Sequence, residues 1–142
     1  MMMNERGQIS SEYLIVVGFV VFLILSVVGV SFFYSNSIND RIKLNQVENF
    51  AVKIIENAES VFYLGEPSQV SISIYLPSGV EDIEIVNEGS GSSLVFTVET
   101  SSGDIIRSFE SNVIIEGDLP ATEGVKNIKI AAGDDRVILS VE

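Results

Sequence analysis

Hydrophobic positions along the chain fall into three successive patterns. Residues 13–34 form a run of 22 uncharged and mainly apolar residues. Residues 45–64 then place apolar side chains three and four positions apart, and from residue 68 apolar and polar residues alternate in short segments. A period near 3.6 is typical of an amphipathic helix, whereas a period of two is typical of half-buried strands. We therefore expect a long N-terminal helix, residues 8–64, followed by a β-rich head domain, residues 68–142.

The uncharged run predicts a membrane-spanning helix. At a rise of about 1.5 Å per residue it covers a hydrocarbon core roughly 30 Å thick. It is too long for an ordinary secretory signal segment, and no A-x-A-like cleavage site follows it. Arg6 precedes the run while Arg41 and Lys43 follow it, so the count of basic residues leaves its direction in the membrane open.

The second pattern, residues 45–64, is an amphipathic helix whose apolar stripe we expect to cover one side of the sheet. The segment before it contains neither Gly nor Pro, which favours one helix from the span to residue 64, although a kink near residues 35–39 stays open. Gly65 and Pro67 provide the stop. The stripe consists of Val47, Phe50, Ala51, Ile54, Ile55, Ala58, Val61 and Phe62, and the opposite face carries Glu48, Lys53, Glu56, Asn57 and Glu59.

The third pattern is a series of short alternating segments separated by turn residues. Residues 70–76, 82–86 and 93–100 are the first three, and Gly, Ser, Asn and Pro residues lie between them. Four further segments follow up to residue 142. Such spacing is typical of an antiparallel sandwich. The expected fold class is therefore α+β, with a long hydrophobic helix followed by a small antiparallel β-sandwich-like head domain.

The amino-acid composition excludes several kinds of partner and site. The chain has 20 acidic and 8 basic residues, a net charge of −12, which disfavours nucleic acid as a partner. It contains no Cys and no His, which excludes disulfides, thiolate metal sites and Ser-His or Cys-His catalysis. We expect no enzyme activity, no cofactor and no metal site.

Several residues of the head domain, and Tyr63 near the end of the helix, are candidates for metal binding, acid/base catalysis or ligand binding, and we disfavour each of these roles. Acidic turn residues are candidate calcium ligands, acidic strand residues are a candidate acid/base pair, and three aromatic residues are candidate ligand contacts. We interpret the first two sets as solvated surface and the aromatic residues as packing residues. These are Glu116, Asp118, Asp134 and Asp135; Glu81, Asp82 and Glu84; and Tyr63, Tyr75 and Phe109.

Glu12 lies alone at the N-terminal margin of the apolar run. A carboxylate there either lies among lipid headgroups or, if the helix packs among others, requires a cation. The nearest basic residue in sequence is Arg6, and a new α-amino group made by proteolysis nearby would serve equally. Gly18 and Gly29, three turns apart on nearly one face, would allow a neighbouring helix to approach closely.

Residues 6–13, Arg-Gly-Gln-Ile-Ser-Ser-Glu-Tyr, followed by the uncharged run, resemble the class III signal peptide of archaeal type IV pilin-like precursors. The resemblance implies that a prepilin peptidase removes residues 1–7 by cutting between Gly7 and Gln8. Glu12 then becomes the fifth mature residue, where type IV pilins generally keep a glutamate. The resemblance also implies that the leader lies in the cytoplasm and the head domain outside. The leader departs from the family pattern, because it has one Arg and one Glu where such leaders are usually more basic.

The function that the resemblance implies is structural. The subunit would be stored in the membrane and polymerised through its N-terminal helix, with membrane-embedded assembly machinery, into an adhesive surface filament. Its partners would be other copies of itself, the peptidase and that machinery. Glu12, Tyr13, Gly18 and Gly29 are the candidate assembly residues. The alternative function is a minor pilin, or an extracellular binding module anchored by a single membrane span.

Overall fold

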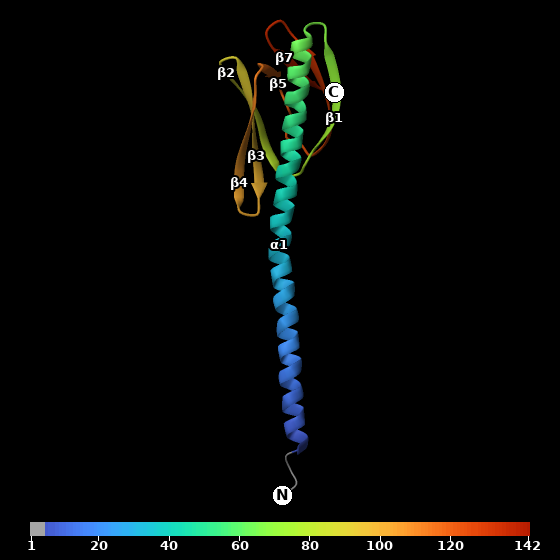
Figure 1. Cartoon of the computed structure of the whole chain (residues 1–142), viewed down its shortest axis with the longest axis vertical. Helices are drawn as coiled ribbons and strands as arrows, with labels where there is room; N and C mark the ends of the chain where they lie inside the picture. The colour runs from blue at the N-terminus through green and yellow to red at the C-terminus, as the bar shows by residue number, and fades with distance from the viewer. Residues whose placement is uncertain (1–4) are drawn as a thin grey trace. The chain divides into compact units, whose positions relative to one another are not determined.

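The structure is a computed structural model that describes the backbone of residues 5–142 and the side chains of residues 10–142. The described chain forms one helix followed by seven strands (Figure 1). It divides into two compact units, one ending at Ile38 and the other comprising Asn39–Glu142. The elements are α1 (Glu5–Leu64), β1 (Gln69–Leu76), β2 (Val80–Glu88), β3 (Gly91–Thr100), β4 (Gly103–Ser111), β5 (Ile115–Gly117), β6 (Gly124–Ala132) and β7 (Val137–Val141).

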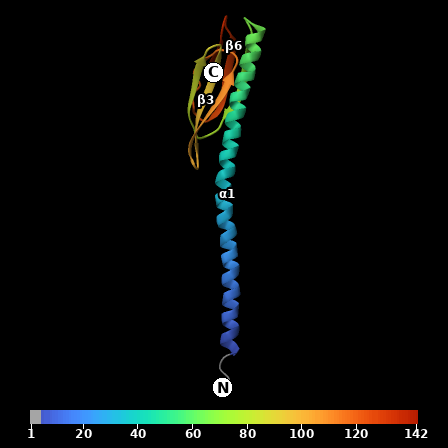
Figure 2. The same ribbon diagram turned by 60° about the vertical axis from the view of Figure 1, so that its left-hand side comes forward.

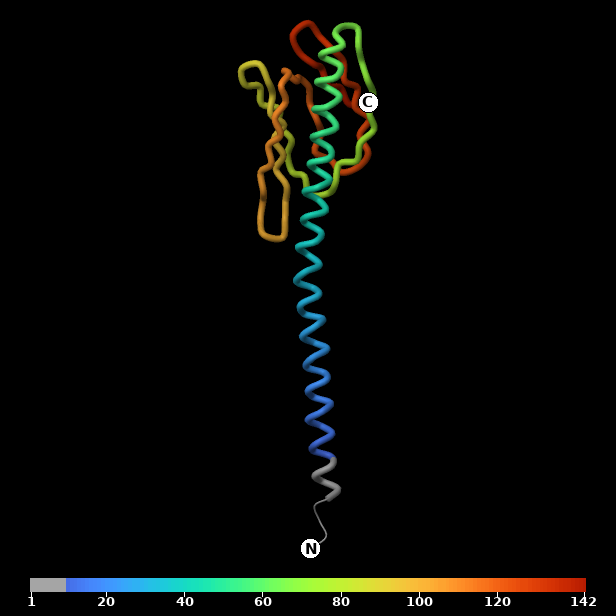
Figure 3. The backbone as a smooth tube through the Cα atoms, in the orientation of Figure 1, coloured from blue at the N-terminus to red at the C-terminus, as the bar shows by residue number. Residues whose placement is uncertain are grey.

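α1 is helical at every residue within its bounds, including residues 35–39, and Figure 3 traces its backbone. The described part of the helix extends from Glu5 to Leu64. Gly65 follows its last residue with a φ of 75°, a conformation that glycine adopts without strain. The Gly65 N–H donates to the carbonyl oxygens of Val61 (3.2 Å) and Phe62 (3.1 Å), which satisfies acceptors at the end of the helix.

The head domain contains two sheets with strand orders β1-β6-β7-β5 and β2-β3-β4. The predicted α+β layout is confirmed, but the first sheet is mixed because β5 pairs parallel with β7, whereas we expected only antiparallel pairs. β5 follows β4 through residues 112–114 without a hairpin, so it enters the other sheet instead of folding back on its own neighbour.

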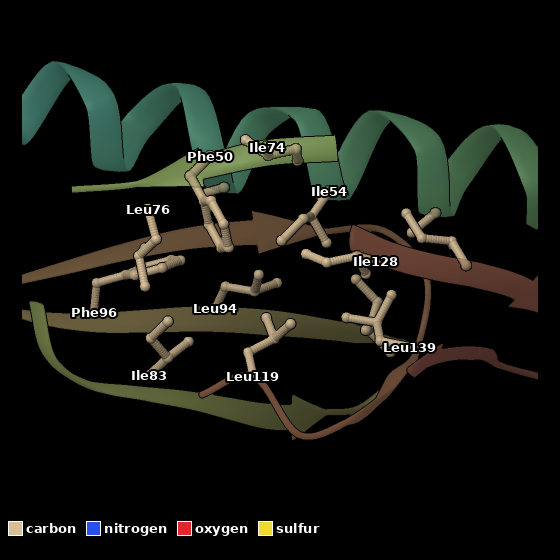
Figure 4. Close-up of a cluster of buried hydrophobic side chains, with 14 of the residues drawn as sticks. Phe50, Ile54, Ile74, Leu76, Ile83, Leu94, Phe96, Leu119, Ile128 and Leu139 are labelled. Atoms are coloured by element: carbon tan, nitrogen blue, oxygen red, sulfur yellow. The ribbon is translucent and has the colours of Figure 1, made fainter. Parts of the chain in front are cut away.

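A single hydrophobic core joins the two sheets to the C-terminal part of α1, which lies alongside the strands in Figures 1 and 2. The predicted helical stripe is buried or half-buried there. Phe50, 1% exposed, packs edge-to-face on Phe96 of β3 with ring centroids 6.1 Å apart. Figure 4 shows Phe50 and Ile54 pointing from the helix toward Leu94 and Ile128 of the strands. The stripe thus covers the open side of the sandwich.

Two carboxylates of α1 hold the ends of β4. Asp40 accepts hydrogen bonds from the backbone N–H of Ser101 (3.1 Å) and from its hydroxyl, just before β4 begins. Glu59 accepts from the backbone N–H (3.0 Å) and the side-chain amide (3.2 Å) of Asn112, just after β4 ends. The two ends of β4 are therefore hydrogen-bonded to the helix at Asp40 and at Glu59.

Candidate functional site

The apolar segment of α1, residues 13–34, is exposed on every side of the helix. Tyr13, Phe22 and Phe33 are 70%, 64% and 79% exposed, and none of the candidate span is buried in the protein. By length and composition the helix can cross a membrane. A helix that is apolar all round requires lipid or other helices on all its faces. The segment is therefore the candidate functional surface of the chain.

The polar atoms of this segment are compatible with such surroundings. The hydroxyls of Ser26 and Ser31 donate to the carbonyl oxygens of Phe22 (2.8 Å) and Val27 (2.9 Å) one turn earlier. These bonds satisfy both hydroxyl donors within the helix, as an apolar environment requires.

The two candidate packing glycines are open to an approaching helix. A Cβ atom added at Gly18 or Gly29 would meet nothing within 4 Å. Small residues allow the backbones of two membrane helices to approach closely. Both positions are available for such a contact.

Aromatic residues mark the two ends of the apolar segment. Tyr13 and Tyr34 are 70% and 63% exposed, and Phe33 contacts Tyr34 edge-to-face with ring centroids 6.5 Å apart. The two tyrosines are separated by about 31 Å of helix, close to the roughly 30 Å thickness of a hydrocarbon core. Tyrosine rings favour the boundary between lipid and water, so both ends suit the two interfaces of one bilayer.

Glu12 is exposed, one residue before Tyr13, and makes no ion pair within residues 10–142. Its predicted partners, the Gln8 amine or Arg6, lie outside the residues whose side chains the structure describes. The processing residues Gly7 and Gln8 are described only as backbone of α1, and residues 1–4 of the leader lie outside the described chain. Within the described side chains, the carboxylate of Glu12 is thus available to a cation from another chain.

Two of the acidic turn residues of the head domain pair with an arginine side chain. The Arg136 guanidinium forms ion pairs with Glu116 and with Asp135, the latter at 2.8 Å from Nε to Oδ1. The hydrogen bond from Arg136 holds the pKa of the Asp135 carboxyl below its ordinary value. Among the described residues, no group of three or more acidic side chains is arranged to hold a metal ion. The carboxylates considered as calcium ligands thus include two that bind arginine.

The remaining candidates in the head domain differ in environment. Glu81, Asp82 and Glu84 are exposed on β2. Phe109 packs on Phe96 with ring centroids 5.8 Å apart, which confirms it as a packing residue. Tyr63 contacts Phe62 edge-to-face with ring centroids 5.8 Å apart, but it is 74% exposed at the end of α1 and is not part of the core.

Sequence reasoning also missed the roles of Asp40 and Glu59 in holding β4. From the sequence, Glu59 belongs only to the polar face of the helix, and nothing indicates a specific contact for Asp40. Their partners, Ser101 and Asn112, are 61 and 53 residues away in the chain. No local pattern carries a signal for pairs at that separation.

No protein-family model matches the chain, and no curated protein or solved structure matches it either.

Proposed function

We propose that this chain is a structural subunit of an archaeal type IV pilus-like surface filament. In this proposal the precursor is stored in the membrane through α1 with the head domain outside. A prepilin peptidase removes residues 1–7, and the mature chain polymerises through its N-terminal helix. The acidic head domains coat the filament, which serves adhesion.

The observation that carries the proposal is the complete exposure of an apolar helical segment on a chain whose head domain has its own core. The core of the head domain includes the helical stripe between Val47 and Val61, whereas residues 13–34 make no part of this core and stay exposed. A simple anchor needs only lipid around such a segment. A filament subunit needs a segment that exchanges lipid for identical helices, and repeated head-to-tail contacts of this type give open filaments.

Glu12 is the residue that distinguishes a subunit from an anchor in this proposal. Cleavage between Gly7 and Gln8 would create an α-amino group four residues before Glu12. A carboxylate surrounded by apolar helices is costly unless it pairs with a cation. Pairing of Glu12 with the Gln8 amine of its own or a neighbouring chain would therefore set the axial position of each subunit.

The processing step can be tested by expressing the full chain with and without the peptidase and measuring its mass. We expect the mature mass to correspond to a chain starting at Gln8, and Gly7→Val to abolish the change. A product that stays full length, with or without Gly7→Val, would refute the processing step. Mass analysis of protein sheared from cells provides the same test on native material.

The assembly step can be tested with Glu12→Ala and Glu12→Gln. Both remove the charge and should leave membrane insertion intact, because they make the helix less polar. We expect filaments counted by electron microscopy to fall by about tenfold or more, since an unpaired Gln8 amine would remain in the helical bundle. Glu48→Ala, an exposed glutamate on the same helix, is the matched control. Normal filaments with Glu12→Ala would rule out this role.

Antibody labelling of the head domain separates the alternative functions. Uniform labelling along filaments supports a major subunit. Sparse labelling on filaments would indicate a minor pilin, and membrane-bound protein without any filament fraction would indicate an anchored binding module.

A further inference from the structure

The tip of the β3-β4 hairpin extends beyond the hydrophobic core of the head domain. Figures 1 and 2 show the hairpin lying along α1 and reaching further than the other strands. Residues 99–108 are exposed or half-buried. Ile105 is 36% exposed although it pairs with Val98, which is fully buried. The core therefore ends at Val98 in this hairpin, and the tip is held by other contacts.

The turn of α1 that contacts this tip, residues 40–43, also lies outside the core. Asp40 and Lys43 are half-buried, and the two residues between them are exposed. Among the described residues, the first in α1 that packs against the core is Leu44. The boundary between the two compact units falls just before this turn, after Ile38. The turn thus belongs to the unit of the head domain without contributing a side chain to its core.

Polar contacts connect this turn of α1 to two loops of the β2-β3-β4 sheet. Asp40 accepts hydrogen bonds from the backbone N–H of Ser101 (3.1 Å) and from its hydroxyl. The Lys43 ammonium donates to the carbonyl oxygen of Glu99 (3.4 Å). The Glu99 N–H in turn donates to the carbonyl oxygen of Gly79 (2.7 Å), in the turn between β1 and β2. We name these five residues, Asp40, Lys43, Gly79, Glu99 and Ser101, the clasp.

Gly79 packs closely on the other members of the clasp. A Cβ atom added at Gly79 would lie 2.9 Å from Nζ of Lys43 and 3.4 Å from the carbonyl oxygen of Glu99. Its φ of 85° is also a conformation that glycine adopts without strain. The Lys43 ammonium therefore lies against both loops at once, and a side chain at Gly79 would displace it from its acceptor.

The members of the clasp depend on each other because neither segment has a core contact of its own. Segments with few buried apolar contacts open locally at a lower free energy than the whole domain unfolds. Hydrogen bonds to charged groups, such as those of Asp40 and Lys43, are stronger than those between neutral groups. The charged hydrogen bonds are thus the main contacts that keep the hairpin tip on the helix.

We propose that the clasp is a conformational device that opens as one unit and sets the residue at which α1 leaves the head domain. With the clasp closed, the head domain holds the helix from Asp40. With the clasp open, it holds the helix from Leu44, and the hairpin tip is free. This inference goes beyond the proposed function and does not depend on it.

The consequence concerns how freely the head domain is attached. Opening adds one turn of helix, about 6 Å, to the part of α1 that the head domain does not hold. Whatever partner binds residues 13–34, the head domain is connected to it through this turn. The clasp therefore controls the freedom of the head domain to move about its attachment.

Residue-resolved hydrogen exchange on the full chain in detergent tests whether the clasp opens as one unit. Asp40→Asn removes the carboxylate, and Lys43→Met removes the ammonium but keeps an unbranched side chain. We expect Lys43→Met to speed exchange of the Ser101 amide by about tenfold, although Lys43 donates to Glu99 and not to Ser101. Asp40→Asn should likewise speed exchange of the Glu99 amide. If each variant speeds exchange only at its own contact, the contacts are independent and the proposal is overturned.

Two matched controls accompany these variants. Arg41→Met removes an exposed cation between the two helical members of the clasp, which makes no ion pair with a described residue, and should change no amide of the clasp. Glu59→Gln acts at the other end of β4 and should speed only the Asn112 amide. Faster exchange at Ser101 in either control would overturn the specific role of the clasp.

The core strand β6 shows whether opening is local. Exchange of the Ile128 and Ile130 amides, which lie in the buried part of β6, should stay unchanged in Asp40→Asn and Lys43→Met. Equal acceleration of these amides and of Ser101 would show that the clasp opens only when the whole domain unfolds, which would overturn the proposal.

Spin-label distances measure the opening itself. The chain has no native cysteine, so Ser102→Cys on the hairpin tip and Asn45→Cys on the exposed side of α1 can each carry one label. We expect a single narrow distance distribution by double electron–electron resonance, and a broader one that extends to longer distances when Asp40→Asn and Lys43→Met are added. An unchanged distribution would overturn the proposal. No arm of these experiments requires filaments, so the proposed function is tested separately.

Discussion

The packing of α1 on the head domain can be tested at Phe50. Phe50→Ala removes a ring that is 1% exposed and that packs on Phe96. Truncation of a buried phenylalanine typically lowers the free energy of unfolding by about 3–5 kcal/mol, through lost burial and the cavity that remains. A domain of this size is stable by only about 5–15 kcal/mol, so this single change removes a large share of its stability.

The control and the assay follow from the same helix. Val52→Ala shortens a side chain that is 37% exposed on the opposite face and should cost no more than about 0.5 kcal/mol. The measurement is hydrogen exchange of β6, whose Ile128 and Ile130 are fully buried, followed by mass spectrometry at increasing urea on the full chain in detergent. At a slope near 1.5 kcal/mol per molar urea, Phe50→Ala lowers the midpoint by about 2–3 M.

The reasoning would be refuted by either of two results. A loss below about 1 kcal/mol for Phe50→Ala would mean that the helix is not part of the head domain's core. An equal loss for Val52→Ala would mean that the exposed face of the helix also contributes to folding, which contradicts the burial pattern.

Two further predictions concern polar contacts of the head domain. Ser92→Ala leaves the buried N–H of Ile115, which donates to the Ser92 hydroxyl at 2.7 Å, without a partner. By the same assay, it should lower the free energy of unfolding by about 1–3 kcal/mol. The control Ser71→Ala removes an exposed hydroxyl and should leave the free energy of unfolding unchanged. An equal loss for both variants would contradict the role of Ser92. The Ser101 hydroxyl holds the pKa of the Asp40 carboxyl below its ordinary value. The contact is therefore fully formed when the pH is above the ordinary pKa of Asp, and it is lost as the pH falls through the lowered pKa of Asp40. Exchange protection of the Ser101 amide should therefore decrease in acid; Asp40→Asn should show no such step, and a step that persists would refute the assignment.

Local sequence patterns predicted the elements because each pattern has a local physical cause. The three- and four-residue spacing from Val47 to Phe62 follows from helix geometry, and the alternation from Leu94 to Val98 follows from strand geometry. Gly65 ends α1 because it adopts a positive φ without strain. The uncharged run from Tyr13 to Tyr34 likewise predicts a membrane-spanning helix, because its length and apolar character match a hydrocarbon core.

By itself, then, the sequence determined the helix, its apolar span, its buried stripe and the series of strands. Only the tertiary structure decided how the strands divide into two sheets and that β5 runs parallel to β7. It also decided that Asp40 and Glu59 hold the ends of β4. These features depend on pairing between segments far apart in the chain, which is selected by the packing of the whole core and leaves no periodic signal in any one segment.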